Sequence, residues 1–407
     1  MSTFNGKIVE IPKISADNFE GDNVTSLVYF LSHCHSDHMR GLDNINFQNS
    51  LLQRPGVYLY ASSISIKILK NIYKDKSRYP RIESKLKVIP VNHPTLIKIP
   101  DTNQSFTVTT IPAGHCPGSV MFLFEIDNKN ILYTGDYRAS ANDLEKFKAF
   151  YSLGNLKRID KMYLDTTFFN KSYLKFPPRR ESLEQICSAI KEWIERDPKH
   201  LVNITPTAKY GSEFLFMEIA KEMQMPIHVN EDCYNVYKCI PEMDNAVTLN
   251  PAETRIHSNC GIKYKQICLT STEFLREIVP SAMWWRGKNL ESFVEEEHEN
   301  KIRICYSSHA SFEEIKDFLL LLKPAEVEPC VVPTSVKEKI DLTNLLEQIM
   351  LSYKVDCSNE NVKLFDRVEV VELQDDDEED NLPDDLLHSP KNDFKRRRKW
   401  LVDGTEL

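Results

Sequence analysis

The first half of the chain contains short apolar runs, and later segments place apolar residues at helical spacing. The short runs are rich in β-branched and aromatic residues, as is typical of strands, and cover residues 27–31, 57–60, 106–109, 120–124, 131–133 and 161–164. From residue 183 to 194 the apolar positions follow one helical face, and Asp197-Pro198 ends that helix. Similar patterns predict helices at residues 213–223 and 312–322. This order predicts an α/β protein with layered sheets.

Composition limits the class of protein. The chain has 407 residues, 41% of them hydrophobic, so it can build about two or three domains with ordinary cores. It has no apolar run long enough to span a bilayer and no signal-peptide pattern at its start. We therefore expect an intracellular, soluble protein without membrane contact. Its ten cysteines are scattered, so no disulfide framework is predicted.

The net charge of −9 is a property of the last residues. Residues 371–390 hold nine acids and no Lys or Arg, and residues 391–407 hold six bases and three acids. The first 370 residues therefore carry −9 + 9 − 3 = −3, which does not exclude a polyanionic substrate. Residues 372–407 are predicted to be a disordered acidic and basic tail. Its cluster Lys395–Lys399 fits a nuclear import signal, a nucleic-acid arm or a solvated charge run.

A dense group of potential metal ligands follows the first predicted strand. His33, His35 and Asp37 share one strand parity, and a turn is needed to bring His38 to the same place. Imidazole nitrogens and carboxylate oxygens both suit zinc. Four such donors so close together are hard to satisfy as ordinary buried groups. A metal site is therefore favoured over the alternative, a polar surface loop.

Two further donors stand at the ends of later strands. His115 lies in Pro112-Ala113-Gly114-His115-Cys116-Pro117-Gly118, and Asp136 lies in Thr134-Gly135-Asp136. Each is weak evidence alone, but the order His-x-His-x-Asp-His, His, Asp resembles the metallo-β-lactamase family. The resemblance implies an αββα sandwich with two zinc ions. The first ion would be held by His33, His35, His115 and Asp136, and the second by Asp37, His38 and the same Asp136.

The long second half resembles the β-CASP subgroup of that family, whose members act on nucleic acids. Asp165 in Tyr163-Leu164-Asp165-Thr166-Thr167 and His309 in Ser307-Ser308-His309 match the residues that complete the site in that subgroup. Asp17 matches an acidic position that supports the ligand shell. Cys330-Val331-Val332-Pro333 is apolar where RNA-cleaving members have a late histidine, so the chain is similar to the DNA-directed branch.

The resemblance covers about residues 1–350 and implies a discontinuous first domain. Residues 1–165 and 303–355 would form the metallo-β-lactamase domain, and residues 166–302 an inserted α/β β-CASP domain. Candidate phosphate-binding residues are Lys209, Ser307 and Ser308, although the two serines could simply cap the next helix. The resemblance also implies a third, structural zinc held by His228, His257, Cys260 and Cys268, with altered ligand spacing.

The expected activity is zinc-dependent phosphodiester hydrolysis at DNA ends, overhangs and hairpins, leaving a 5′ phosphate. It would combine 5′ exonuclease and structure-selective endonuclease action in double-strand-break repair by end joining. By resemblance the partners are DNA, DNA-dependent protein kinase and a DNA ligase complex. The protein would be nuclear and monomeric. The alternatives are a 5′ exonuclease of crosslink or telomere-end processing, a small-thioester hydrolase and an inactive scaffold.

Overall fold

The computed structural model describes residues 2–74, 82–206, 211–258 and 274–365. The chain divides into two compact units, Met1–Leu351 and Ser352–Leu407. Of the second unit the structure describes only the last part of helix α9 (Val336–Phe365). The predicted tail, residues 372–407, lies outside the described residues. All that follows concerns the first unit.

The first sheet has four parallel strands in the order β1-β2-β3-β4. They are β1 (Ile14–Ala16), β2 (Val28–Leu31), β3 (Tyr58–Ala61) and β4 (Leu86–Val88). Two helices connect them, α1 (Ile45–Gln53) and α2 (Ser63–Ile72), and the side chains of Asn44 and Ser62 cap their first turns. All of β2 is buried, as expected for a parallel strand covered on both faces.

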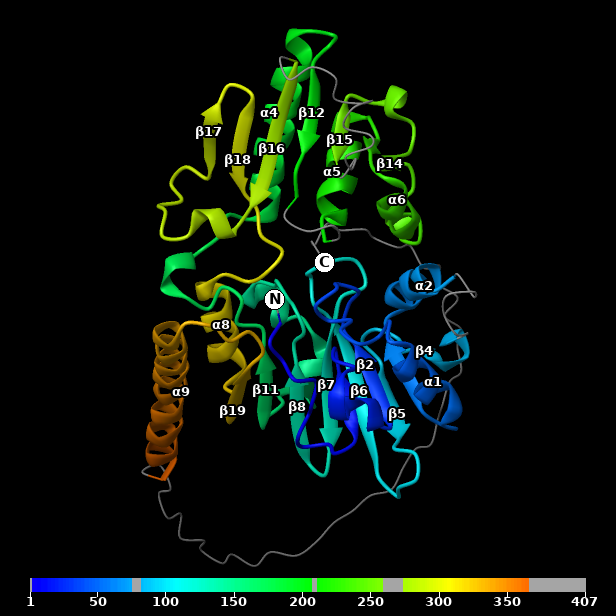
Figure 1. Cartoon of the computed structure of the whole chain (residues 1–407). Coiled ribbons are helices and arrows are strands. Elements are labelled where there is room, and N and C mark those ends of the chain that lie inside the picture. The colour runs from blue at the N-terminus through cyan, green and yellow to red at the C-terminus, as the bar shows by residue number, and fades with distance from the viewer. Residues whose placement is uncertain (1, 75–81, 207–210, 259–273, 366–407) are drawn as a thin grey trace, which may run out of the picture. The chain divides into compact units, whose positions relative to one another are not determined.

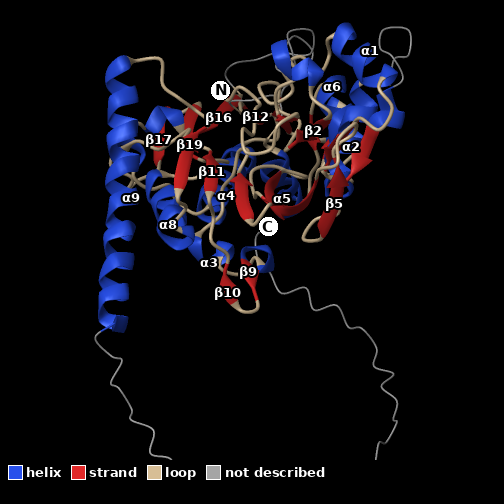
Figure 2. Ribbon diagram, turned by 90° about the horizontal axis from the view of Figure 1, so that it is seen from below, coloured by secondary structure: helices blue, strands red, loops and turns tan. Residues whose placement is uncertain are grey.

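The second sheet has six strands in the order β19-β11-β8-β7-β6-β5, parallel at one edge and antiparallel elsewhere. Its strands are β5 (Pro94–Lys98), β6 (Ser105–Pro112), β7 (Val120–Ile126), β8 (Lys129–Tyr133), β11 (Lys161–Leu164) and β19 (Glu326–Pro329). Helices α3 (Ala141–Leu144) and α8 (Phe312–Leu322) are associated with it, and β9 (Tyr151–Ser152) pairs with β10 (Asn155–Leu156). Figure 2 shows α1 and α2 on one flank and α3 and α8 on the other.

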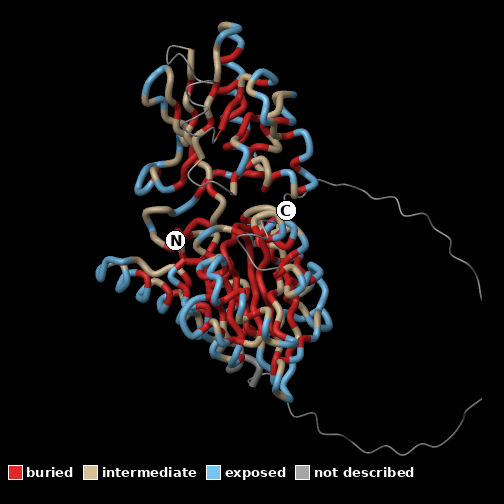
Figure 3. Tube along the Cα trace, turned by 45° about the vertical axis from the view of Figure 1, so that its right-hand side comes forward, coloured by how far each residue is buried: buried red, intermediate tan, exposed pale blue. Residues whose placement is uncertain are grey.

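The two sheets pack face to face around an aromatic core. Phe30 of the first sheet contacts Phe122 and Phe124 of the second, with ring centroids 5.1 and 5.0 Å apart. On the opposite face of β2, Tyr29 packs against Phe47 of α1. Figure 3 shows this buried interior between exposed outer turns. The predicted αββα sandwich is therefore confirmed.

The inserted segment forms a separate seven-stranded sheet in the order β14-β13-β15-β12-β16-β18-β17 (Figure 1). Only β17 is antiparallel to its neighbour. The strands are β12 (Leu201–Ile204), β13 (Ile227–His228), β14 (Val247–Thr248), β15 (Ile256–Ser258), β16 (Leu275–Ser281), β17 (Val294–His298) and β18 (Lys301–Cys305). In the part of the insertion that the structure describes, the α-helices are α4 (Arg179–Arg196), α5 (Glu213–Met223) and α6 (Glu231–Tyr237).

The predicted boundaries of the insertion, residues 166 and 302, stay predictions. All of β18 pairs with β16, so the expected boundary between residues 302 and 303 falls inside a hydrogen-bonded strand. The chain leaves this sheet only after Cys305. The three predicted helices are present, and α5 and α8 have the predicted bounds. Short 3-10 turns, among them η7 (Met283–Trp285), complete the connections. Within the described residues, no helix has both the length and the apolarity needed to cross a bilayer.

Candidate metal centre

The donor residues lie in loops that leave the carboxyl ends of strands. After β2 the chain turns at residues 36–38, where the backbone N–H of His38 donates to the carbonyl of His35 at 3.1 Å. This is the turn that the sequence required to redirect His38. His115 follows β6 and Asp136 follows β8, so separate strands bring their donors to one edge.

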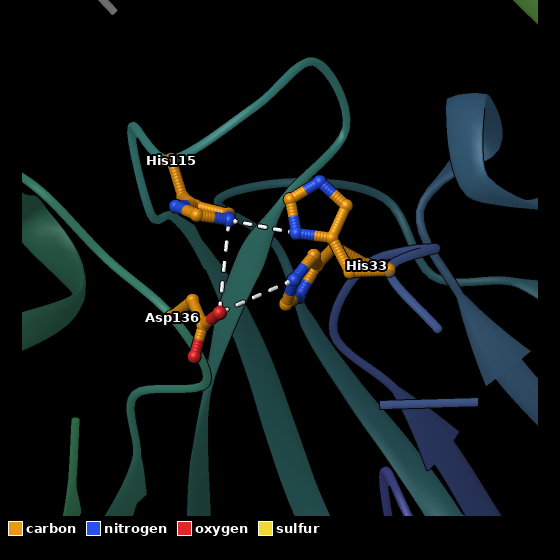
Figure 4. Close-up of side chains that lie close together, drawn as sticks. His33, His115 and Asp136 are labelled. Atoms are coloured by element: carbon orange, nitrogen blue, oxygen red, sulfur yellow. Dashed lines mark hydrogen bonds and ion pairs between the residues drawn. The ribbon is translucent and has the colours of Figure 1, made fainter. Parts of the chain in front are cut away.

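The first donor set consists of His33, His35, His115 and Asp136, whose ligand atoms lie within 4.8 Å of one another. Nε2 of His33 and of His115 lie 3.6 and 3.7 Å from Oδ2 of Asp136 (Figure 4). Nε2 of His115 lies 3.1 Å from Nδ1 of His35. Two ligands of one tetrahedral zinc, each about 2.0–2.1 Å from the ion, would lie roughly 3.3 Å apart. The observed separations fit a cation of that size.

The second donor set uses the other oxygen of the same carboxylate. Oδ1 of Asp136 lies 3.1 Å from Nε2 of His38, and Oδ2 of Asp37 lies 4.0 Å from that nitrogen. Asp37 also accepts a hydrogen bond from the backbone N–H of Ser2. Asp136 therefore faces one donor set with each oxygen, which is the geometry of a carboxylate shared by two cations.

Protonation favours metal binding by the first set. Burial holds the pKa of His33 and of His115 well below the usual range, and burial lowers the pKa of His35 to about 4. These imidazoles are neutral at pH 7, as metal ligands must be. Burial would also lower the pKa of His38, but the carboxylates of Asp136 and Asp17 outweigh it and raise that pKa well above 6.5. The negative charge of these two carboxylates would also attract a metal cation.

Asp17 supports the ligands from behind. Its carboxylate accepts hydrogen bonds from the backbone N–H of Ser32 at 2.7 Å, from the Ser32 hydroxyl and from the Tyr133 hydroxyl at 2.8 Å. It also accepts from Nδ1 of His38 at 2.8 Å. Nδ1 of His33 in turn donates to the Ser32 hydroxyl at 2.9 Å. These bonds fix the tautomers of His33 and His38, so that Nε2 of these two residues faces the donor cluster.

The pair predicted to complete the site is assembled. Nδ1 of His309 donates to Oδ2 of Asp165 at 2.9 Å, and Nε2 of His309 lies 3.8 Å from Oδ2 of Asp136. The other oxygen of Asp165 accepts from the backbone and the hydroxyl of Thr167. Burial would lower the pKa of His309, but the charges of Asp165 and Asp136 outweigh it and raise that pKa. The two carboxylates therefore favour the protonated form of His309.

Of the predicted phosphate-binding residues, the two serines line the pocket above the donors. The Ser307 hydroxyl donates to the carbonyl of His309 and accepts from its N–H, so it shapes the turn before His309. The carbonyl of Ser308 accepts from Nδ1 of His115 at 2.9 Å. Ser311, and not Ser307 or Ser308, caps the following helix. Lys209 lies outside the described residues.

Half of the predicted structural zinc site is described. His228 of β13 and His257 of β15 pair across the sheet, and their Nδ1 atoms lie 3.1 Å apart. Both are buried, and burial lowers the pKa of His257 to about 4. Cys260 and Cys268 lie outside the described residues, so the full set stays a prediction.

Several residues that hold the donors in place could not be predicted from a single sequence. Ser32 and Tyr133 bind Asp17 from different strands, so their role depends on tertiary contact. Arg138 is buried and donates to the carbonyls of Ser307 and Pro177. Gly211 lies against the His35 ring, where an added Cβ would come within 2.9 Å of it. Only the glycine could have been noticed, as a break between a strand and a helix.

These residues fit a resident metal. The Nε2 atom of His33 is buried and makes no hydrogen bond with any residue that the structure describes. A lone pair left bare inside a polar cluster is costly unless a cation accepts it. The neutral imidazoles of the first set, their hydrogen-bonded second nitrogens and the carboxylate that faces both sets fit a dinuclear site. The His and Asp clusters are therefore a metal site.

Comparison with known proteins agrees with this geometry. Residues 180–335 match the family described as DNA repair metallo-beta-lactamase, and residues 15–153 match the family described as anti-Pycsar protein Apyc1. Human Artemis is 33% identical over 413 residues, which cover 96% of this chain and 58% of Artemis. Mouse Artemis is 32% identical, with 96% and 57% covered. The 5′ exonuclease Apollo of Rattus norvegicus is 29% identical, with 80% and 55% covered. The chain thus spans little more than half the length of these relatives.

Proposed function

We propose that the chain is a metal-dependent DNA nuclease of the metallo-β-lactamase family, to which the family match and the similarity to Artemis point, and that it hydrolyses phosphodiesters at DNA ends, overhangs and hairpins. The observation that carries this proposal is the convergence on Asp136 of donors from four separate parts of the chain: residues 33–38, His115, Asp165 and His309. The support for DNA as the substrate is the matched family, described as DNA repair metallo-beta-lactamase, and the similarity to the 5′ exonuclease Apollo.

The proposed cofactors are two zinc ions, one in each donor set. His33, His35, His115 and Asp136 would hold one, and Asp37, His38 and Asp136 the other. Two cations so close together supply Lewis-acid polarisation of a phosphoryl oxygen and activation of water. Nitrogen and carboxylate donors of this kind suit zinc, though they also bind other divalent metals.

The protein's own residues orient the reaction. Asp17 holds His38 and Ser32 in place, and Ser32 holds His33, so the ligand tautomers do not change during turnover. Asp165 fixes the His309 ring, whose Nε2 faces Asp136 in the pocket. In the proposed mechanism this pair orients the nucleophile and stabilises charge on the attacked phosphorus. Water adds to phosphorus as the bond to the 3′ oxygen breaks. The departing 3′ oxygen gains the proton that the water loses and becomes a hydroxyl, and the other product carries a 5′ phosphate.

The finer biological role follows the relatives. We propose double-strand-break repair by end joining, in the nucleus, as the setting. Contacts with DNA-dependent protein kinase and a DNA ligase complex remain predictions, because the tail is outside the described residues. An inactive scaffold is disfavoured because every predicted catalytic donor is present and faces the same centre.

The test uses the purified chain with labelled hairpin and 5′-overhang DNA, with and without a chelator. We expect cleavage that the chelator abolishes and added zinc restores. Asp37→Ala or His115→Ala should abolish cleavage while the circular dichroism spectrum is retained. His93→Ala is the matched control, because His93 is an exposed histidine outside the site. Retained cleavage in either donor variant would refute the assigned ligand set.

The same assay separates the alternatives. Opening at the hairpin tip supports endonuclease action, whereas digestion only from free 5′ ends supports an Apollo-like 5′ exonuclease. Hydrolysis of a small thioester without DNA cleavage would support the third alternative. Absence of bound metal after zinc loading would support the scaffold.

A further inference from the structure

We infer that the pocket over the metal donors contains a nucleobase-binding wall, supplied by the insertion, in which Met283 stacks on the base next to the scissile phosphate. This inference deepens the proposed nuclease function and rests on it. It names a specificity-determining surface that the metal donors do not provide.

The pocket has two chemically different sides. One side consists of metal donors and their partner histidine, and the other consists mainly of apolar groups of the insertion. The polar side contains His35, Asp37, His115, Asp136 and His309, and the opposite side contains Pro206, Pro280, Ala282, Met283 and Tyr306. The pocket has a volume of about 230 Å³ and is open to solvent. A nucleotide whose phosphate reached the donors would therefore extend along the pocket wall and would not be enclosed.

The topology of the insertion sheet independently marks this edge as a ligand site. From β12 the chain passes to β13, β14 and β15 on one side of the sheet, and it then crosses to β16 and β18 on the other side. In open parallel α/β sheets, ligands bind outside the carboxyl ends of the strands where the order reverses in this way. Pro206 follows β12, Met283 follows β16 and Tyr306 follows β18, so the apolar side is built from those carboxyl ends (Figure 1).

Met283 is the prominent apolar group on this side. It begins η7 and is 68% exposed, although it lines a pocket whose other side is charged. A thioether is polarizable and packs favourably on aromatic rings. A phosphodiester bound at the metals carries a base on each neighbouring nucleotide, and every base offers a π face for sequence-tolerant stacking. An apolar side facing a phosphate site therefore fits a nucleobase.

The test is a double-mutant cycle in which substitution of Met283 is combined with removal of a DNA base. Met283→Ala and Met283→Leu are compared with the wild-type chain on a single-stranded oligonucleotide that is cleaved at one position. Matched oligonucleotides carry an abasic site immediately 5′ or 3′ of the scissile bond. We expect Met283→Ala to lower kcat/KM about five- to tenfold on intact DNA, near the lower limit for stacking on one base. Met283→Leu, which keeps the apolar contact, should stay within about twofold.

The coupling between the Met283 substitution and the abasic site decides whether the side chain contacts the base. If Met283 stacks on the base, the abasic site at one position should lower wild-type kcat/KM by a similar factor, and Met283→Ala should then cause no further loss. Leu249→Ala is the control, because Leu249 is an exposed leucine of the insertion that does not line the pocket. The base-binding wall would be refuted if Met283→Ala lowered kcat/KM by the same factor on intact DNA and on both abasic oligonucleotides, or if Met283→Ala had the wild-type kcat/KM. Neither result would affect the proposed nuclease function. Absence of wild-type DNA cleavage would overturn the proposed function together with this inference.

Discussion

Arg138 connects the αββα sandwich to the two segments that enter and leave the insertion. Its guanidinium donates to the carbonyl of Pro177 on the entering segment and to the carbonyl of Ser307 on the returning segment, each at 2.9 Å. Its Nε lies 3.3 Å from Glu314, and its side chain is 7% exposed. Because Ser307 precedes His309, we expect the Arg138→Met substitution to perturb both stability and catalysis.

The magnitude follows from these contacts. Removing one member of a buried, hydrogen-bonded charge pair costs about 3–5 kcal/mol. Arg179 also donates to the carbonyl of Ser307, so that carbonyl keeps a partner and the lower half of this range applies. We expect a loss of about 3–4 kcal/mol, which lowers Tm by roughly 4–5 °C for a chain of this size. Displacing His309 by a fraction of an ångström should lower kcat by about ten- to a hundredfold.

The assay measures Tm, zinc content and steady-state cleavage for Arg138→Met, Arg138→Lys and Arg158→Met. Lysine keeps the charge beside Glu314, but one ammonium cannot reproduce the two-carbonyl fork, so its effect should be intermediate. Arg158 is the control, because its side chain is 79% exposed and its ion pair contributes little. A wild-type Tm and kcat for Arg138→Met would refute the reasoning. A lower Tm with unchanged kcat at a permissive temperature would show that Arg138 stabilises the fold without positioning His309.

Three further predictions follow from individual contacts. Gly211→Ala places a Cβ 2.9 Å from the His35 ring at a φ of +104°, so zinc retained after gel filtration should fall, and normal retention would contradict this. Burial raises the pKa of Glu213, so the folded wild type binds more protons above pH 4.5 than the unfolded chain and loses stability as pH rises. In chelator, Glu213→Gln should therefore gain Tm relative to wild type between pH 4 and pH 8, and a constant difference would contradict this. Tyr133→Phe removes a buried donor to Asp17, which should cost about 1–2 kcal/mol in denaturant unfolding, and a more stable variant would disprove it.

Local pattern was sufficient for the most strongly apolar elements of the fold, but it did not predict α1, β1, β4 or β5. Helix α5 and helix α8 begin and end where their apolar periodicity and flanking residues predict. The limits of the insertion were less predictable. Lys301–Cys305 has the composition of either sheet, and only its pairing with β16 assigns it to the insertion.

The sequence by itself determined which residues can bind a metal, because donor chemistry and the position of a donor after a strand are local properties. It placed His33, His35, His38 and Asp136 among the predicted ligands before any contact was known. The tertiary structure decided how they act together: which oxygen of Asp136 faces which histidine, and which groups lock the tautomers. Contacts such as Tyr133 to Asp17 or Arg138 to Ser307 join residues more than a hundred positions apart. No local pattern encodes them, because they form only when two sheets and an inserted domain are packed together.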